Sequence, residues 1–330
     1  MNSMVTKSSK DNSIFSPRFF IKNQHLQSFL ASAHFLTPFH HALLANSRDI
    51  IIETSQKSKL LACVSPAPQS KGLFVIIHGW EGSSSSAYVL AAGSFFYRLG
   101  YSVCRLNLRD HGESHHLNEG LFHGALLDET FDAINHLARQ SEDLPVYLLG
   151  FSLGANFSLR IAIKNSQTPI KNLKQVFAVS PPLDPYKATL AIDQGPAFYR
   201  KYFLKKWKRS LRTKQKLFPD IYNFEKMLEA RTCMALTSDM MAYYTEFPTY
   251  RDYFNLYTLN GRSFQGLNVP VKIFIAADDP VIPLDDFRSL DDNDFLSISR
   301  QTYGGHCGFI DLFPYRRWHQ ERIAEALLLT

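Results

Sequence analysis

Residues 145–164 read PVYLLGFSLGANFSLRIAIK, in which a short apolar run and a helical pattern flank a glycine-bounded turn. The run Pro145–Leu149 is typical of a buried strand, and Ala155–Lys164 is typical of a helix. Between them, Gly150–Gly154 matches G-x-S-x-G, a sharp strand-to-helix turn that pushes the central hydroxyl clear of a sheet. A glycine-rich turn with an incidental serine is the alternative. Because a strand and a helix flank the turn as the motif requires, we expect Ser152 to be a nucleophile.

The same alternation of apolar runs and helical patterns continues on both sides of this turn. Each run is short and apolar, as in strands that are buried on both faces. This alternation predicts an α/β fold, a mostly parallel central sheet flanked by helices, with an antiparallel edge hairpin over Ile50–Val64. The other expected strands are Leu73–Ile77, Ser102–Leu106, Lys174–Val179, Val271–Ala276 and Leu296–Tyr303, and the other expected helices are Ala87–Leu99, Leu126–Arg139 and one around Arg317–Leu328.

The segment 183–267 differs in character from the rest of the chain. It is rich in Tyr, Phe, Lys and Arg and contains no clear buried strand. We therefore expect a helical cap over 183–267, inserted late in the sheet of a core formed by 1–182 and 268–330. The cap aromatic residues expected to line an apolar acyl pocket are Phe198, Tyr199, Tyr243 and Tyr244.

Candidate partners for a serine nucleophile follow the last two expected strands. His306 lies in the sequence GGHCGF, whose glycines suit a loop that bends the imidazole toward Ser152. A carboxylate that orients this imidazole should end the preceding strand, where Asp278 and Asp279 are adjacent. We favour Asp279 as the acid, because the acid in a loop of this kind commonly lies just before the pattern x-apolar-apolar-Pro, here 280–283. Asp278 would shape the turn. Asp184, after an earlier strand, is the outside candidate.

An oxyanion hole is expected beside the nucleophile. His78-Gly79-Trp80 directly follows the expected strand Leu73–Ile77, a position from which the Trp80 amide can point at a substrate carbonyl. The Leu153 amide, at the start of the helix after Ser152, would be the second donor. We expect His78 to stabilise this loop rather than to transfer a proton.

Together these residues resemble the α/β-hydrolase superfamily, and more narrowly its YheT-like branch. The serine, acid and histidine occur in the chain order of that superfamily, and the narrower resemblance rests on His25-Leu26-Gln27, HGWEGSSSSAY over 78–88 and GGHCGF over 304–309. The loop Asn107–Ser114 departs from the branch and is closer to monoacylglycerol-lipase-like relatives. The resemblance implies a Ser-His-Asp hydrolase of short- to medium-chain or lipid-like carboxylic esters that uses no cofactor. Thioesters, lactones and amides share the same acyl-transfer chemistry.

The net charge of +6 is concentrated in one segment. Arg200–Lys216 holds nine Lys and Arg and no acid, which leaves 6 − 9 = −3 on the rest of the 330 residues. Apolar residues recur in this segment every three to four positions, so a cap helix packed on the core is one interpretation. Attraction to an anionic membrane surface is the second. Nucleic-acid binding is not expected, because the segment contains no recognition motif.

Several other classes of site are disfavoured. Four cysteines lie far apart, without the C-x-x-C pairs of a structural zinc site or a disulfide framework, which fits a reducing compartment. The polar loop with His111, His115, His116 and His123 lacks the helical spacing of metal ligands, so we expect a solvated or loop-bracing cluster. No secretory signal or membrane span is evident, and a soluble cytoplasmic protein is expected. The sequence leaves the oligomeric state open. A catalytically weak hydrolase fold that acts as a binding or membrane-surface module is the alternative function.

Overall fold

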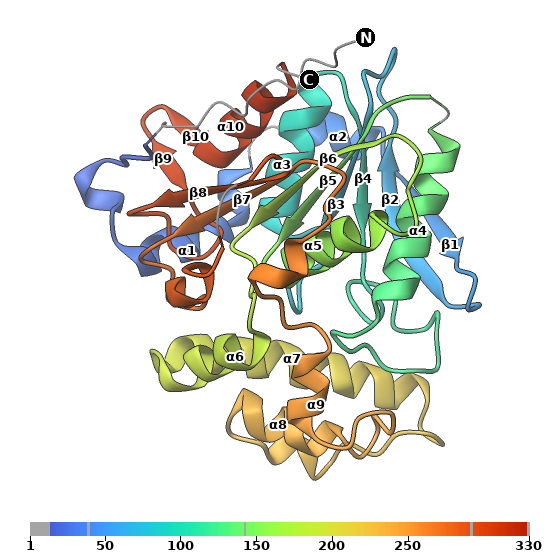
Figure 1. The fold of residues 1–330 in the computed structure, drawn as a ribbon. Coiled ribbons are helices and arrows are strands. Elements are labelled where there is room, and N and C mark those ends of the chain that lie inside the picture. Colours follow the sequence, from blue (N-terminus) through green and yellow to red (C-terminus); the bar gives the residue numbers. More distant parts are fainter. Residues whose placement is uncertain (1–13, 38–39, 142, 291–292, 329–330) are drawn as a thin grey trace.

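The computed structural model describes residues 14–37, 40–141, 143–290 and 293–328. Its centre is an eight-stranded sheet in the order β1-β2-β4-β3-β5-β6-β7-β8 (Figure 1). The strands are β1 (Arg48–Glu53), β2 (Lys59–Ser65), β3 (Leu73–Ile77), β4 (Ser102–Leu106), β5 (Val146–Phe151), β6 (Leu173–Val179), β7 (Val271–Ala276) and β8 (Leu296–Gln301). This confirms the predicted α/β fold with a mostly parallel sheet.

Parallel pairing runs from β4 through β3, β5, β6 and β7 to β8, whereas β2 pairs antiparallel with both β1 and β4. The predicted hairpin over 50–64 is therefore β1 and β2, with β1 at the edge. Every residue of β3 and β5 is buried. Strands covered on both faces read as continuous apolar runs, which is why they could be recognised in the sequence.

Helices cover both faces of this sheet. The helices outside segment 183–267 are α1 (Gln24–Ala31), α2 (His41–Ala45), α3 (Ala87–Arg98), α4 (Leu127–Gln140), α5 (Leu153–Asn165) and α10 (Trp318–Leu327). Apolar residues of α3 and α10 pack with Phe74 and Ile76 of β3 in one cluster. Those of α4 and α5 pack with Val75 and Ile77 in another, because successive strand residues face opposite sides.

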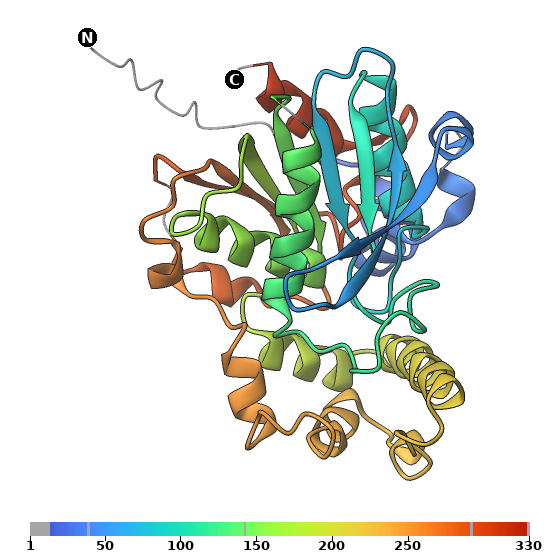
Figure 2. The same ribbon diagram turned by 90° about the vertical axis from the view of Figure 1, so that its right-hand side faces the viewer.

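Four α-helices between β6 and β7 form a separate layer. They are α6 (Pro185–Gln194), α7 (Ala197–Leu217), α8 (Cys233–Met240) and α9 (Tyr250–Asn255). Figures 1 and 2 both show them gathered below the sheet, on the side where the chain leaves β6. We call this layer the helical segment. It coincides with the expected cap, and its role as a separate domain stays a prediction.

The structure differs from the expected elements at a few ends. Helix α5 begins at Leu153, two residues before the predicted start, because the chain turns sharply at Ser152. A short antiparallel hairpin, β9 (Ile310–Leu312) and β10 (Tyr315–Arg317), was not predicted. Across the described residues, no helix has both the length and the apolar character needed to cross a bilayer.

Candidate active site

The strand-to-helix turn places Ser152 between the end of β5 and the start of α5. Its backbone has φ +52°, a left-handed conformation that L-residues seldom adopt and that marks strained functional turns. The flanking glycines are required by close backbone approaches. A Cβ on Gly150 would lie 2.2 Å from the Gly154 carbonyl oxygen, and one on Gly154 would lie 2.4 Å from the His78 carbonyl oxygen.

Three side chains from three loops meet at this turn. The His306 Nε2 lies 3.0 Å from the Ser152 Oγ, and its Nδ1 lies 3.0 Å from the Asp279 Oδ2. Asp279 follows β7, and its Oδ1 accepts hydrogen bonds from the Val281 and Ile282 amides at 2.8 and 3.0 Å. These amides fix the carboxylate in place. The arrangement has the nucleophile–base–acid geometry of hydrolytic triads.

The other two candidate acids make different contacts. Asp278 accepts a hydrogen bond from the Gly305 amide at 2.8 Å, so it shapes the loop that carries His306. Asp184 caps helix α6 by accepting from the Lys187 amide at 3.1 Å. Of the three carboxylates, Asp279 is the one that reaches the imidazole.

The surroundings of His306 favour its protonated form. Burial is the largest single influence and opposes a charge on the ring, but the carboxylate of Asp279 and the neighbouring Cys307 together raise the pKa of His306 well above its ordinary value. An imidazole with a raised pKa is a stronger base toward a serine hydroxyl.

The loop after β3 is braced by His78. Burial lowers the pKa of this histidine to about 4, so the ring is neutral. Its Nδ1 donates to the Gly79 carbonyl at 2.7 Å, and its Nε2 accepts from the Leu108 amide at 3.1 Å. Trp80, two residues after His78, lines a pocket together with Ser152 and Leu153. Among the residues that the structure describes, the amides of Trp80 and Leu153 have no acceptor, as oxyanion donors require.

The pocket at Ser152 encloses about 750 Å³, its open mouth included, and is mostly apolar. The helical segment supplies much of its wall. Of the four aromatic residues expected there, Tyr244 alone lines it; Phe198 is 53% exposed. The lining residues with aromatic rings other than Tyr244 are Trp80, Phe122, His123, Phe203, Trp207, Tyr253, Phe254 and Tyr257. From the sequence, Phe203 and Trp207 were not assigned to the pocket; their i, i+4 spacing on the apolar stripe of α7 is the signal that could have indicated them.

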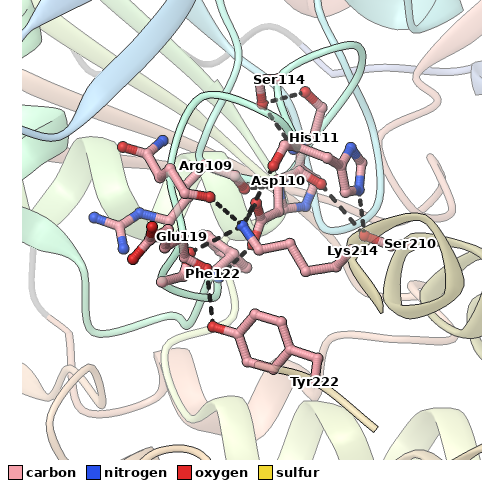
Figure 3. A network of polar contacts seen from close by, with 12 residues as sticks. Arg109, Asp110, His111, Ser114, Glu119, Phe122, Ser210, Lys214 and Tyr222 are labelled. Atoms are coloured by element: carbon pink, nitrogen blue, oxygen red, sulfur yellow. Dashed lines mark hydrogen bonds and ion pairs between the residues drawn. The ribbon is translucent and has the colours of Figure 1, made fainter. Parts of the chain in front are cut away.

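The histidine-rich loop after β4 is tied into the protein at several points (Figure 3). His111 is buried against the His78 ring at 4.8 Å, and the His115 Nε2 lies 2.7 Å from the Ser210 Oγ on α7. His123 pairs with Glu246 at 3.0 Å. Within the described ranges, no three His, Cys, Asp or Glu side chains are grouped as metal ligands.

The mostly parallel sheet, the turn at Ser152 and the contacts among Ser152, His306 and Asp279 are together those of an α/β-hydrolase fold. A family model described as serine aminopeptidase, S33, matches residues 68–293, and the chain belongs to this family. The narrower YheT-like resemblance stays a prediction.

Individual relatives are distant. The chain is 24% identical over 275 residues to a monoacylglycerol lipase of Saccharomyces cerevisiae, a match that covers 78% of this chain and 59% of that protein. The chain thus spans about three fifths of that relative. Similar solved structures include an esterase of Pyrococcus furiosus (TM-score 0.55, 16% identity, 84% of this chain and 89% of that chain). A serine hydrolase of Cycloclasticus zankles is also similar (TM-score 0.53, 12% identity, 86% and 96%). Both structures support the fold.

Proposed function

We propose that the protein is a serine hydrolase that cleaves carboxylic esters through an acyl-enzyme intermediate. The observation that carries the proposal is the continuous path from the Ser152 Oγ through the His306 ring to the Asp279 carboxylate, with 3.0 Å at each step. Membership of a hydrolase family, the esterase-like fold and the named activity of the yeast relative support it.

The side chains divide the reaction between them. His306 takes the proton as the Ser152 Oγ attacks the ester carbonyl, while Asp279 holds the ring and stabilises its charged form. The amides of Trp80 and Leu153 hold the oxyanion. The tetrahedral intermediate then expels the alcohol, which receives the proton from His306, and leaves an acyl group on Ser152. Water, deprotonated by His306, releases the acid and restores the serine. This sequence of steps requires no cofactor.

The pocket favours an apolar acyl chain. We propose that the helical segment acts as a cap, because its helices α6, α7, α8 and α9 all contribute residues to the pocket that opens at Ser152. Short- to medium-chain or lipid-like esters fit such a lining.

The four cysteines are free and buried, which supports the proposal of a reducing compartment such as the cytoplasm.

Hydrolysis of a series of p-nitrophenyl esters, from acetate to palmitate, tests this function. Wild type should hydrolyse at least one chain length, and Ser152→Ala should reduce its rate to background. Equal rates in the two proteins would contradict the proposal. A complete lack of Ser152-dependent turnover on esters, thioesters and lactones would favour the catalytically weak binding module instead.

A second function is favoured by the charges on α7. Four of the nine cations of Arg200–Lys216 are tied to the protein: Arg200, Lys206, Lys208 and Lys214 donate to Asp193, Glu81, Ala230 and Asp110. The other five are exposed at successive spacings of four, four, three and four, which places them in one stripe along the helix: Lys201, Lys205, Arg209, Arg212 and Lys216.

We propose that this stripe attracts the enzyme to an anionic lipid surface. No acidic side chain pairs with these five cations in the described part of the chain. Co-sedimentation with phosphatidylserine vesicles should fall on adding salt, and it should be lost in the double variant Lys205→Glu, Arg209→Glu. Arg139→Glu, an exposed cation at the end of α4, is the matched control and should bind as wild type. Equal binding of the wild type to neutral vesicles and to phosphatidylserine vesicles would contradict the proposal.

A further inference from the structure

Helix α1 lies against the loop that carries His306, although both fall outside the residues matched by the family model. We propose that two residues of this helix, Ser28 and Gln27, are positioning residues that hold the His306 loop in its reactive geometry. This inference rests on the proposed function of His306 as the base. It gives a role to the His25-Leu26-Gln27 stretch, to which the reaction itself assigns none.

Ser28 is bonded directly to the backbone of His306. The His306 amide donates to the Ser28 Oγ at 2.8 Å, and the Ser28 hydroxyl in turn donates to the Gln24 carbonyl one turn earlier in α1, at 2.7 Å. The hydroxyl thus has one donor and one acceptor partner, and its orientation is fixed. The backbone from which the imidazole extends is therefore tied to a helix.

Gln27 holds the far end of the same loop. Its side chain is fully buried, and it uses both ends of the amide. The Nε2 donates to the Ile310 and Ile21 carbonyls at 2.8 Å each, while the Oε1 accepts from the Ile310 amide at 2.9 Å. Two of these three bonds join the Gln27 amide group to the carbonyl and the amide of Ile310, as the backbone of a neighbouring strand would.

Two of the three glycines of GGHCGF are explained by this contact. Gly305 has φ +53°, and a Cβ there would lie 2.4 Å from the Gln24 carbonyl oxygen. A Cβ on Gly308 would lie 2.8 Å from the Gln27 carbonyl oxygen. The loop can approach the helix this closely because glycine stands at these two positions.

The loop needs external support because its own conformation is unfavourable. Cys307 and Phe309, on either side of Gly308, have φ of +59° and +49°, a region that costs L-residues free energy. Such residues keep this conformation where surrounding contacts over-determine it. The bonds to Ser28 and Gln27 are contacts of this kind, and displacing the ring by about 1 Å is enough to slow a reaction up to about 100-fold.

Steady-state kinetics of Ser28→Ala on a p-nitrophenyl ester test the proposal. We expect kcat to fall about tenfold while KM stays within about twofold, because the ring is displaced and the pocket is not. Ser28→Thr keeps the hydroxyl and should restore most of kcat. Ser141→Ala is the matched control, because Ser141 makes the same bond to the carbonyl four residues earlier, Leu137, at the end of α4. It should behave as wild type.

Gln27→Met, which keeps the side-chain length and removes all three bonds, should lower kcat further. The thermal unfolding temperature of each variant is measured alongside, so that kinetics are compared among folded proteins. Unchanged kcat in Ser28→Ala, or an equal fall in Ser141→Ala, would overturn the positioning role. Ser152→Ala, assayed in parallel, separates this result from failure of the proposed function. If turnover does not depend on Ser152, the function fails; if it does and Ser28→Ala matches wild type, the positioning role alone fails.

Discussion

Lys214 on helix α7 and Asp110 in the loop after β4 form a buried ion pair, with 2.8 Å between the Nζ and the Oδ1 (Figure 3). The ammonium also donates to three carbonyls of the same loop, those of His115, Asn118 and Gly120. The Asp110 Oδ2 accepts from the amide of Phe122, which lines the pocket. One lysine therefore joins the helical segment to the loop that forms a wall of the pocket.

Removing one partner of this pair should be costly. Burial raises the pKa of Asp110 and lowers that of Lys214, which disfavours both charged forms. The opposite charge of the partner favours the charged form of each group. Lys214→Met leaves a buried carboxylate without its cation and should lower the free energy of unfolding by about 3–5 kcal/mol. Urea denaturation measures this loss. Lys216→Met, an exposed neighbour on the same helix, should change stability by less than about 0.5 kcal/mol. Similar losses in the two variants would contradict a structural role for the pair.

The two adjacent aspartates should differ sharply in their effect on turnover. Asp279→Asn removes the charge that orients the His306 ring and should lower kcat by about 10³–10⁴-fold. Asp278→Asn keeps an oxygen that can accept from the Gly305 amide and should cost less than about tenfold. Initial rates of ester hydrolysis compare the two. The assignment is wrong if Asp278→Asn is the more damaging variant.

The dependence of kcat/KM on pH should report the protonation of His306. The ring must be neutral to take the serine proton, and its pKa is raised well above its ordinary value of 6.5. Activity should therefore rise with pH, with an inflection above 6.5. Asp279→Asn removes the carboxylate that raises this pKa, so its inflection should move to lower pH. A wild-type inflection below 6.5, or the same inflection in both proteins, would contradict this electrostatic account.

A buried histidine that packs against β5, the strand before Ser152, should lower the free energy of unfolding at acidic pH. His319 on α10 is fully buried against the rings of Phe151, Phe274 and Phe309. Among the described residues, neither ring nitrogen has a hydrogen-bond partner, and burial lowers the pKa of His319 to about 3. Below about pH 6.5 the unfolded chain binds a proton at this site that the folded chain does not bind, so folding loses free energy as the pH falls.

His319→Phe removes this loss and should be more stable than wild type at low pH. The gain in unfolding free energy should grow by up to about 1.4 kcal/mol for each pH unit below about 6.5. Urea denaturation at about pH 7.5 and about pH 5 measures it. His136→Phe, at an exposed position of α4, should show no such growth. A gain for His319→Phe that is the same at both pH values would refute the explanation.

Features encoded within one short segment could be predicted from the sequence. The buried strands appear as continuous apolar runs, and Ser152 stands in a five-residue G-x-S-x-G motif directly between a strand and a helix. Asp279 and His306 follow consecutive strands of a parallel sheet, whose carboxyl ends meet at one edge. Their contact therefore followed from the predicted topology.

Contacts between distant segments could not be predicted. Ser28 and His306 are 278 positions apart, and Lys214 and Asp110 are 104 apart. In the sequence, Lys214 is one more cation in a basic run; its burial depends on how α7 docks on a loop of the core. For the same reason, Phe198 and Tyr199 were expected in the pocket, although the start of α7 turns their rings toward His25 instead.

Covalent labelling with a fluorophosphonate tests the central claim most directly, that Ser152 is a nucleophile activated by His306. The serine oxygen would displace fluoride from phosphorus, which adds one phosphonyl group to the chain. Peptide mass spectrometry should place a single label on the peptide that contains Ser152. Labelling should be absent in Ser152→Ala and slowed at least about 100-fold in His306→Ala. A label on another residue, or full ester hydrolysis by a chain whose Ser152 stays unlabelled, would contradict the account.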